Sequence, residues 1–457
     1  MVRPRCDERC HHTVARQRTL SPRPTHLAAA ADINRDGVWS VDRAVHPVSW
    51  RWQAPVYSPV SPRALFQGIG AACGVLRTRD ETVIEELKNR YDALDVLLTD
   101  SGTSALILAL RATVPPGGTV AYPGYACIDL TSAAVGAGVK VRLYDLDPET
   151  LSPNLESVRR VIQRGVDAIV VAHLYGYPAD MGAVQALAAD HGIPVIEDAA
   201  QGAGGTLHGK RLGSIGSIGI LSFGRGKGMT AGSGGALLAR TPASAEWMRR
   251  IRKTLETPSR GGGEIVGLAA QWLLTHPLLY RLPATLPALK LGEMVYKPPR
   301  PPRTIRLAAL AVLQTALRMD DGEVHARYAR ASDLLSRING ASGLRAIIPV
   351  AGGKPGFLRL ALVDAVGDAA PQVTLGAVRA YPMTLEQHQQ LRPLLATGEQ
   401  AGSGSEFLRD RLFTVPTHSR VAASDARRLS DWIATRTHHV LPREARKTEQ
   451  ENAWRHA

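Results

Sequence analysis

The chain has 457 residues, more than one hydrophobic core normally organises, and this length predicts two folded domains with tails. Its hydrophobic fraction of 44% and charged fraction of 21% are those of an ordinary soluble globular protein. The formal net charge of +14 raises nucleic acid, an anionic membrane and phosphorylated substrates as partners. No RRM, KH or zinc-finger pattern is present, so a nucleic-acid partner is not expected.

The N-terminal segment, residues 1–50, is rich in Arg, His and Pro and predicts a basic, poorly ordered tail. Its one apolar cluster is too short for the core of a signal peptide. Cys6 and Cys10, with His11 and His12 after them, resemble half of a zinc site. No second pair with ligand spacing follows, so no metal is expected.

Four cysteines are too few for a disulfide framework. Cys73 and Cys127 stand in apolar surroundings and are expected to be reduced residues of the core. This pattern is typical of a cytoplasmic protein.

From about Val96 to Arg240 the sequence alternates short β-rich runs with helical segments, a pattern that favours a mainly parallel sheet flanked by helices. This stretch is predicted to belong to a large domain over 51–245. The run Ala168–Ala172 is wholly apolar, as in a parallel strand covered on both faces. Between the strands, a helix is expected over Met181 to Asp190. The expected strands are Val96–Leu98, Thr119–Tyr122, Lys140–Asp145, Ala168–Ala172, Pro194–Ile196 and Ile218–Leu221.

Polar residues gather where these strands end, the edge at which open α/β sheets bind ligands. Ser101, Gly102, Thr103 and Ser104 lie between a strand and a helix, where backbone N–H groups, hydroxyls and the helix end can hold a phosphate. Serine and threonine at a helix start are more often simple N-caps, so this motif alone is weak.

Glu197 and Asp198 follow the next apolar strand, and two acids at such a position need partners or water. One interpretation is that Asp198 keeps a cationic ring nitrogen protonated, which makes the ring an electron sink. The alternative is that both acids meet water at the strand end.

Lys227 follows the strand Ile218–Leu221 in a glycine-rich turn, Ser222-Phe-Gly-Arg-Gly-Lys227. Glycines there let the backbone approach a bulky ligand. A lysine in such a pocket can act as a Schiff-base nucleophile, although most lysines are surface residues. The order of phosphate motif, acid and lysine along one domain favours the catalytic interpretation.

The rest of the chain is predicted as a Pro-rich apolar and basic connector over 246–303, a smaller α/β domain over 304–442 and a polar tail over 443–457. A long helix is expected over Ile305 to Ile338. The most apolar stretch, Ile265 to Leu291, is interrupted by three prolines, so no membrane span is expected. It is interpreted as a helical connector packed on its own protein; a segment lying on a membrane or on a partner subunit is the alternative.

These motifs resemble those of fold type I pyridoxal-phosphate (PLP) enzymes, specifically the DegT/StrS-like sugar aminotransferases. The resemblance runs from about Val56 to Trp432, is strongest between Leu97 and Leu238, and is absent from the first fifty residues. The matching blocks stand at Ser101–Leu106, His173–Gly176 with Asp180-Met181, Glu197–Gln201, Ser222–Lys227, Gln314–Arg327 and Val415–His418.

The resemblance implies a role for each matched residue. Gly102, Thr103, Ser104 and Ser222 would hold the cofactor phosphate, Asp198 would pair with the pyridine nitrogen and Gln201 would lie near the ring hydroxyl. Lys227 would form the Schiff base with PLP. The family usually stacks an aromatic side chain on the ring, and here Cys127 occupies that position. Either Tyr125 supplies the stacking or a thiol covers that face.

The resemblance implies an aminotransferase that moves an amino group, plausibly from glutamate, to a keto group of a nucleotide-linked sugar, as in polysaccharide or antibiotic sugar biosynthesis. A homodimer is implied, with Arg300 to Arg327 contributing to the neighbouring site. Lys227 favours transamination over the dehydratases of the family, in which histidine replaces the lysine. A PLP-dependent dehydratase or lyase and a non-catalytic regulatory protein on the same scaffold are the alternatives.

Overall fold

A computed structural model describes residues 50–256, 258–286, 294–338, 343–367 and 369–435. The chain divides into two compact units, Met1–Val45 and His46–Ala457, and the first lies wholly outside the described residues. The half zinc motif at Cys6 to His12, the predicted N-terminal tail up to residue 49 and the predicted C-terminal tail 443–457 also lie outside the described residues.

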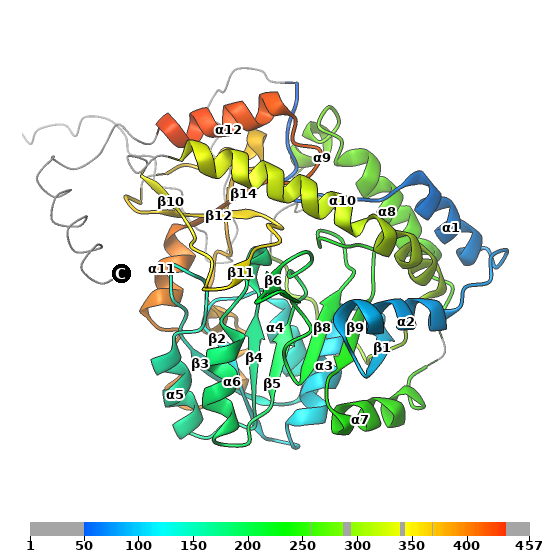
Figure 1. Cartoon of the computed structure of the whole chain (residues 1–457), viewed down its shortest axis with the longest axis vertical. Helices are drawn as coiled ribbons and strands as arrows, with labels where there is room; N and C mark the ends of the chain where they lie inside the picture. The colour runs from blue at the N-terminus through cyan, green and yellow to red at the C-terminus, as the bar shows by residue number, and fades with distance from the viewer. Residues whose placement is uncertain (1–49, 257, 287–293, 339–342, 368, 436–457) are drawn as a thin grey trace, which may run out of the picture. The chain divides into compact units, whose positions relative to one another are not determined.

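A seven-stranded sheet forms the centre of the described unit (Figure 1). The strands lie in the order β1-β9-β8-β5-β4-β2-β3, and only β9 runs against its neighbours. The apolar run that forms β4 is buried at every position, which explains its lack of alternation. The bounds are β1 Asp95–Thr99, β2 Thr119–Pro123, β3 Lys140–Tyr144, β4 Ala168–Ala172, β5 Val195–Asp198, β8 Ile218–Ser222 and β9 Gly235–Ala239.

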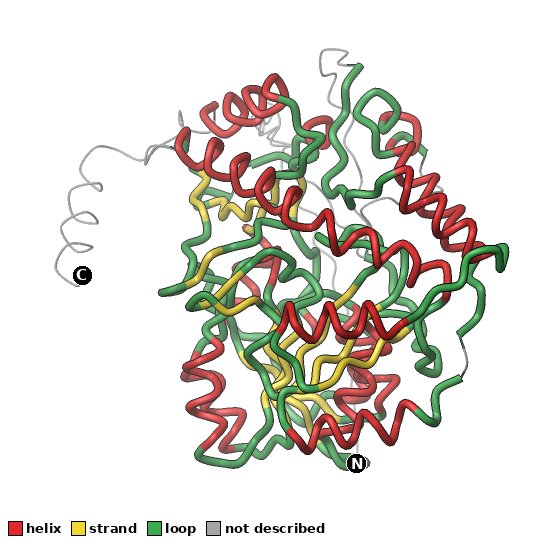
Figure 2. Tube along the Cα trace, turned by 45° about the vertical axis from the view of Figure 1, so that its right-hand side comes forward, coloured by secondary structure: helices red, strands yellow, loops and turns green. Residues whose placement is uncertain are grey.

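Helices flank this sheet on both sides, as Figure 2 shows in red around the yellow strands. α3 packs on β8 and β9, α6 on β5, α5 on β3, and both α2 and α7 on β1. The helix bounds are α2 Asp80–Tyr91, α3 Gly102–Thr113, α4 Asp129–Ala137, α5 Leu155–Gln163, α6 Met181–Ala189 and α7 Pro242–Arg252.

A second, four-stranded antiparallel sheet follows in the order β10-β12-β14-β13. The helix α10, Leu307–Arg337, packs on α1, Pro62–Ala72, and on α12, Ala423–Thr435 (Figure 1). α11 spans Ser403–Arg411, and the strands are β10 Leu344–Ala346, β12 Leu360–Asp364, β13 Val378–Arg379 and β14 Leu412–Val415. A small three-stranded sheet contains β6 Thr206–Leu207, β7 Lys210–Arg211 and β11 Gly353–Lys354.

In the described part of the connector, α7 ends at Arg252, and α8 Gly262–Leu274 and α9 Arg281–Ala284 follow. Several of its large apolar side chains are exposed, among them Val266, Leu273 and Leu282. Among the described residues, no helix is long and apolar enough to cross a membrane. Where the connector and the smaller domain begin and end stays a prediction.

Two expectations need correction. β9 was not expected, because Gly235-Ala-Leu-Leu-Ala239 contains no β-branched residue; its pairing with both β1 and β8 produces the strand. Cys73 is exposed at the C-terminal cap of α1 rather than part of the core, because the helix ends there and the chain turns outward.

The position of β9 between β1 and β8 gives a stability prediction. Leu237 is fully buried in β9, so Leu237→Ala should lower the free energy of unfolding by about 2–5 kcal/mol in chemical denaturation. The control is Leu273→Ala, whose side chain is 52% exposed and which should change stability by less than about 0.5 kcal/mol. Equal effects of the two variants would contradict this account of the core.

Candidate active site

A cavity of about 930 Å³ lies at the carboxyl ends of the parallel strands. Eight of the nine predicted site residues line it, from three strand ends and the start of α3: Gly102, Thr103, Ser104, Cys127, Asp198, Gln201, Ser222 and Lys227. The ninth, Tyr125, is not among the lining residues. Motifs that are separated in the sequence lie together here because the parallel strands end at the same edge of the sheet.

The start of α3 and the end of β8 meet at one wall of the cavity. Ser101 caps the helix, since its Oγ accepts the Ser104 N–H at 3.0 Å and donates to the Ser104 Oγ at 2.9 Å. A Cβ on Gly102 would lie 2.7 Å from the Ser222 Cβ, so only glycine permits this approach. Free N–H groups at a helix start, with two hydroxyls beside them, fit the phosphate of PLP.

Glu197 and Asp198 are neighbours on β5, and their side chains point to opposite faces of the sheet. Glu197 is fully buried. It accepts N–H groups of Gly213 and Ile215 at 2.6 Å and of Gly216 at 2.7 Å, and it meets His173 Nε2 at 2.9 Å. Glu197 is therefore a structural anchor rather than a cavity residue.

His173 has a defined tautomer. Its Nδ1 accepts the backbone N–H of Ala179 at 3.0 Å, so the proton sits on Nε2 and is donated to Glu197. Burial alone would raise the pKa of Glu197, but the hydrogen bonds from His173 and the backbone N–H groups outweigh it and lower that pKa.

Asp198 faces the cavity with one carboxylate oxygen held by the Ala200 N–H at 3.0 Å. Burial raises the pKa of Asp198, against the opposing effects of the Ala200 N–H and of the positive charge of Lys227. A buried carboxylate of this kind favours a cationic partner. The protonated ring nitrogen of PLP is such a partner.

Lys227 lies in a loop that is fastened from a distant part of the chain. The Ser58 Oγ donates to the Lys227 carbonyl at 3.2 Å and accepts the Gly226 N–H at 2.8 Å. Gly226 has φ +80°, a left-handed conformation that favours glycine. Among the described residues no hydrogen bond to the Lys227 amine is found, so the amine is available in the cavity.

Cys127, which the resemblance aligns with the ring-stacking aromatic, lines the cavity. Its side chain is half-buried in the cavity wall, and burial raises the pKa of the thiol to about 12, so it is a neutral thiol at ordinary pH. Tyr125 is fully buried behind it, and its hydroxyl accepts the Tyr381 N–H at 2.8 Å. Between the two candidates from the sequence, the one on the cavity wall is the thiol.

The outer part of the cavity is lined by side chains of the connector and of the Lys227 loop. Lys297 and Arg300 stand exposed at this rim, and so does Arg225. Arg306 is paired with Glu264 of α8. The resemblance implied a contribution from Arg300 to Arg327 to the neighbouring site, whereas here Arg300 lines the cavity of its own chain. The rest of the Pro-rich connector contains no motif that points to this cavity.

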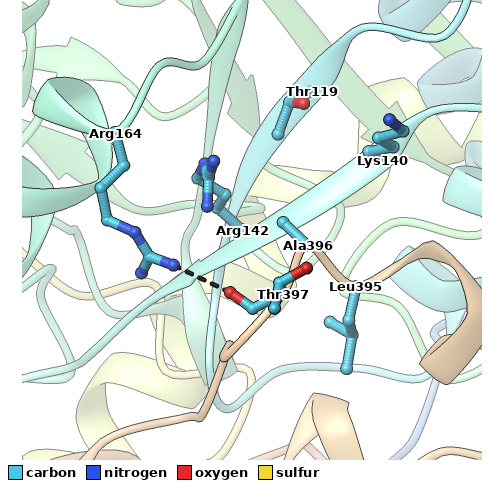
Figure 3. Close-up of a pocket in the computed structure, with 7 residues that line it drawn as sticks. All are labelled: Thr119, Lys140, Arg142, Arg164, Leu395, Ala396 and Thr397. Atoms are coloured by element: carbon cyan, nitrogen blue, oxygen red, sulfur yellow. Dashed lines mark hydrogen bonds between the residues drawn. The ribbon is translucent and has the colours of Figure 1, made fainter.

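A second hollow lies at the opposite edge of the sheet, around the first residues of β2 and β3 (Figure 3). Arg142 and Arg164 both pair with the buried Glu399, at 2.9 and 2.7 Å. None of the predicted site residues lines it.

Part of the chain is similar to a known family. Residues 81–264 match the model of the DegT/DnrJ/EryC1/StrS aminotransferase family. The matched region contains every predicted site residue.

Two curated relatives illustrate the match. An L-glutamine:2-deoxy-scyllo-inosose aminotransferase of Streptoalloteichus tenebrarius is 38% identical over 153 residues, 33% of this chain and 36% of the relative. A UDP-N-acetyl-3-dehydro-alpha-D-glucosamine 3-aminotransferase of Acidithiobacillus ferrooxidans is 39% identical over 154 residues, 33% of this chain and 41% of the relative. The chain thus spans well under half the length of these relatives.

Solved structures resemble the chain over more of its length. DesV of S. venezuelae, solved in complex with a ketimine intermediate, has a TM-score of 0.63 at 21% identity, covering 84% of this chain and all of DesV. The E. coli GDP-4-keto-6-deoxy-D-mannose-3-dehydratase, solved with hydrated PLP, has a TM-score of 0.65 at 13% identity. The match covers 84% of this chain and 100% of the dehydratase. The predicted fold, a type I PLP-dependent transferase fold with a mainly parallel sheet and a smaller C-terminal α/β part, is confirmed.

The buried cluster around Glu197 gives a pH-dependent prediction. Because the pKa of Glu197 is lowered on folding, its stabilisation is complete above the ordinary carboxyl range and is lost as the pH falls through the folded-state value. Glu197→Gln should lower the free energy of unfolding at pH 7 by about 3 kcal/mol. In denaturation curves from pH 7 to pH 3, the difference in free energy of unfolding between the variant and the natural chain should decrease as the pH falls. Glu85→Gln, at a 60% exposed side chain, is the control; a gap of constant size for Glu197→Gln would contradict this assignment.

Proposed function

We propose that the chain is a PLP-dependent aminotransferase that moves an amino group from an amino acid to a keto group of a nucleotide-linked sugar. The observation that carries this proposal is that Lys227, Asp198 and the closely packed pair Gly102 and Ser222 all line one cavity. These residues match the three contacts that PLP needs: an amine for its aldehyde, a carboxylate for its ring nitrogen and a cradle for its phosphate.

Bound PLP would supply an electron sink for a carbanion beside the amino nitrogen. Gly102, Thr103, Ser104 and Ser222 would hold the phosphate and fix the position of the ring. Asp198, held by the Ala200 N–H, would keep a proton on the ring nitrogen. The Lys227 amine would hold the cofactor and would carry a proton between the amino-bearing carbon of the substrate and the cofactor. A histidine at this position could not serve in both roles.

The amino donor is proposed to be glutamate, with glutamine as the second candidate because the Streptoalloteichus relative is named for it. The acceptor is proposed to carry phosphate, since Arg225, Lys297 and Arg300 surround the mouth of the cavity. The Acidithiobacillus relative is named for a UDP-linked keto sugar, which carries the complementary negative charge.

A homodimer in the cytoplasm is proposed as the working form, by analogy with the fold type. The dimer is testable by light scattering.

The lysine gives the first test of the function. Lys227→Ala should abolish the visible absorbance of the PLP-loaded protein and lower the rate of amino transfer at least about 10²-fold. The matched control is Lys210→Ala, which replaces an exposed lysine on β7. This variant should retain both the visible absorbance and the rate of amino transfer. Absorbance is recorded before and after addition of glutamate or glutamine. A Lys227→Ala protein with an unchanged spectrum and full turnover would overturn the proposal.

Analysis of the products distinguishes transamination from the dehydratase alternative. That alternative is considered because the E. coli dehydratase has a similar fold. With glutamate and a UDP-linked keto sugar, transamination yields 2-oxoglutarate and amino sugar in equal amounts. Loss of water from the sugar without net transfer of nitrogen would identify a dehydratase instead.

The basic rim gives the second test. Replacing Lys297 and Arg300 together by glutamate should raise KM for a UDP-linked keto sugar about tenfold, with a smaller effect on kcat, because the charges act on binding. The effect should shrink at high salt. The control is Lys140→Glu, an exposed lysine at the opposite edge of the sheet (Figure 3). An unchanged KM in the double variant would exclude the rim from substrate binding.

A further inference from the structure

Gln201 has an amide orientation that its surroundings determine. Its Oε1 accepts the backbone N–H of Tyr175 at 2.8 Å, and only the oxygen of an amide can accept that hydrogen. The amide NH₂ group is therefore the end that meets the Tyr381 hydroxyl, at 2.5 Å. The usual ambiguity between the two ends of a glutamine side chain is removed here.

An NH₂ group carries two hydrogens, and only one of them is donated to the Tyr381 hydroxyl. Gln201 also lines the cavity beside Asp198 and Lys227. Gln201 thus has one amide N–H left that can be donated to a ligand in the cavity, and the hydrogen bond to Tyr381 restricts its direction.

Tyr381 comes from a distant part of the chain, just after β13 and 180 residues beyond Gln201. Its own N–H is donated to the Tyr125 hydroxyl at 2.8 Å. Its ring packs between those of Tyr125 and Tyr175, with centroid distances of 5.4 and 5.3 Å. The tyrosine is therefore fixed at its backbone, its ring and its hydroxyl.

The groups around Tyr381 keep it neutral. Burial raises its pKa well above the ordinary range, with a contribution from the thiol of Cys127, and burial raises the pKa values of Tyr125 and Tyr175 in the same way. The cation nearby is Arg359, which donates to the carbonyls of Gly376 and Thr414. The Tyr381 hydroxyl therefore remains a hydrogen-bond acceptor for Gln201 over the working pH range.

We propose that Tyr381 is a positioning residue that acts through Gln201, aiming the second amide N–H at the ring oxygen of the cofactor. This inference rests on the proposed function, because it requires PLP in the cavity. It links Tyr381, just after β13, to the cofactor site at the end of β5 through the hydrogen bond to Gln201.

The inference has a spectroscopic consequence. An N–H that donates to the ring oxygen withdraws electron density from it, and that oxygen then attracts the proton on the neighbouring nitrogen less strongly. Loss of a well-aimed donor should therefore raise the pH at which the visible band of the PLP-loaded protein changes. A shift of about 0.5 to 1 pH unit corresponds to one ordinary hydrogen bond.

The test is a pH titration of the visible absorbance of the full chain loaded with PLP. Tyr381→Phe keeps the ring but removes the acceptor, and should raise the midpoint by about 0.5 to 1 unit. Gln201→Ala should raise it by at least as much. The double variant should match Gln201→Ala alone, because Tyr381 acts only through the amide.

Tyr177→Phe is the matched control. Tyr177 is also buried, and its hydroxyl accepts the Ala361 N–H at 3.3 Å, away from the cavity; its removal should leave the midpoint unchanged. An unshifted midpoint in Tyr381→Phe, or additive shifts in the double variant, would overturn the inference while leaving the proposed function intact. Failure of the natural chain to take up PLP would overturn both.

Discussion

The buried carboxylate of Glu197 is the contact around which the site is built. It joins three elements at one point: the end of β5, the turn before β8 and the segment after β4 that carries His173. A charge in this position is tolerated because four donors surround it, three of them on buried residues. Since consecutive residues of a strand alternate in direction, fixing Glu197 on one side also fixes Asp198 on the other. The polar chemistry of the cavity thus depends on a residue that does not line it.

Glu197 and Asp198 both carry a carboxyl group, but their surroundings shift the pKa values of the two groups in opposite directions. Burial opposes ionisation in both, but Glu197 receives enough hydrogen bonds for its pKa to fall, whereas Asp198 has one backbone donor and its pKa rises. The first carboxylate is already satisfied by the protein. The second retains a demand for positive charge, which is the property required of a residue facing a protonated ring.

The sequence was sufficient to predict the sheet, because Val-, Ile- and Ala-rich runs such as Ala168–Ala172 carry their own signal. It was also sufficient to locate the residues at strand ends, because parallel topology brings them together. It could not predict β9, where tertiary pairing overrides weak propensity. Nor could it choose between Tyr125 and Cys127, or find Tyr381, since these depend on which side chains meet across the fold.

The attachment of the Lys227 loop to Ser58 bears on how the protein acquires its site. The two residues are separated by 169 positions, and the loop is closed only when the segment before α1 has docked. Contacts between such remote segments form after more local structure, because chain entropy must be lost before they contribute. The central sheet can therefore assemble before its lysine loop is secured. Competence to hold a cofactor is accordingly a late event in folding.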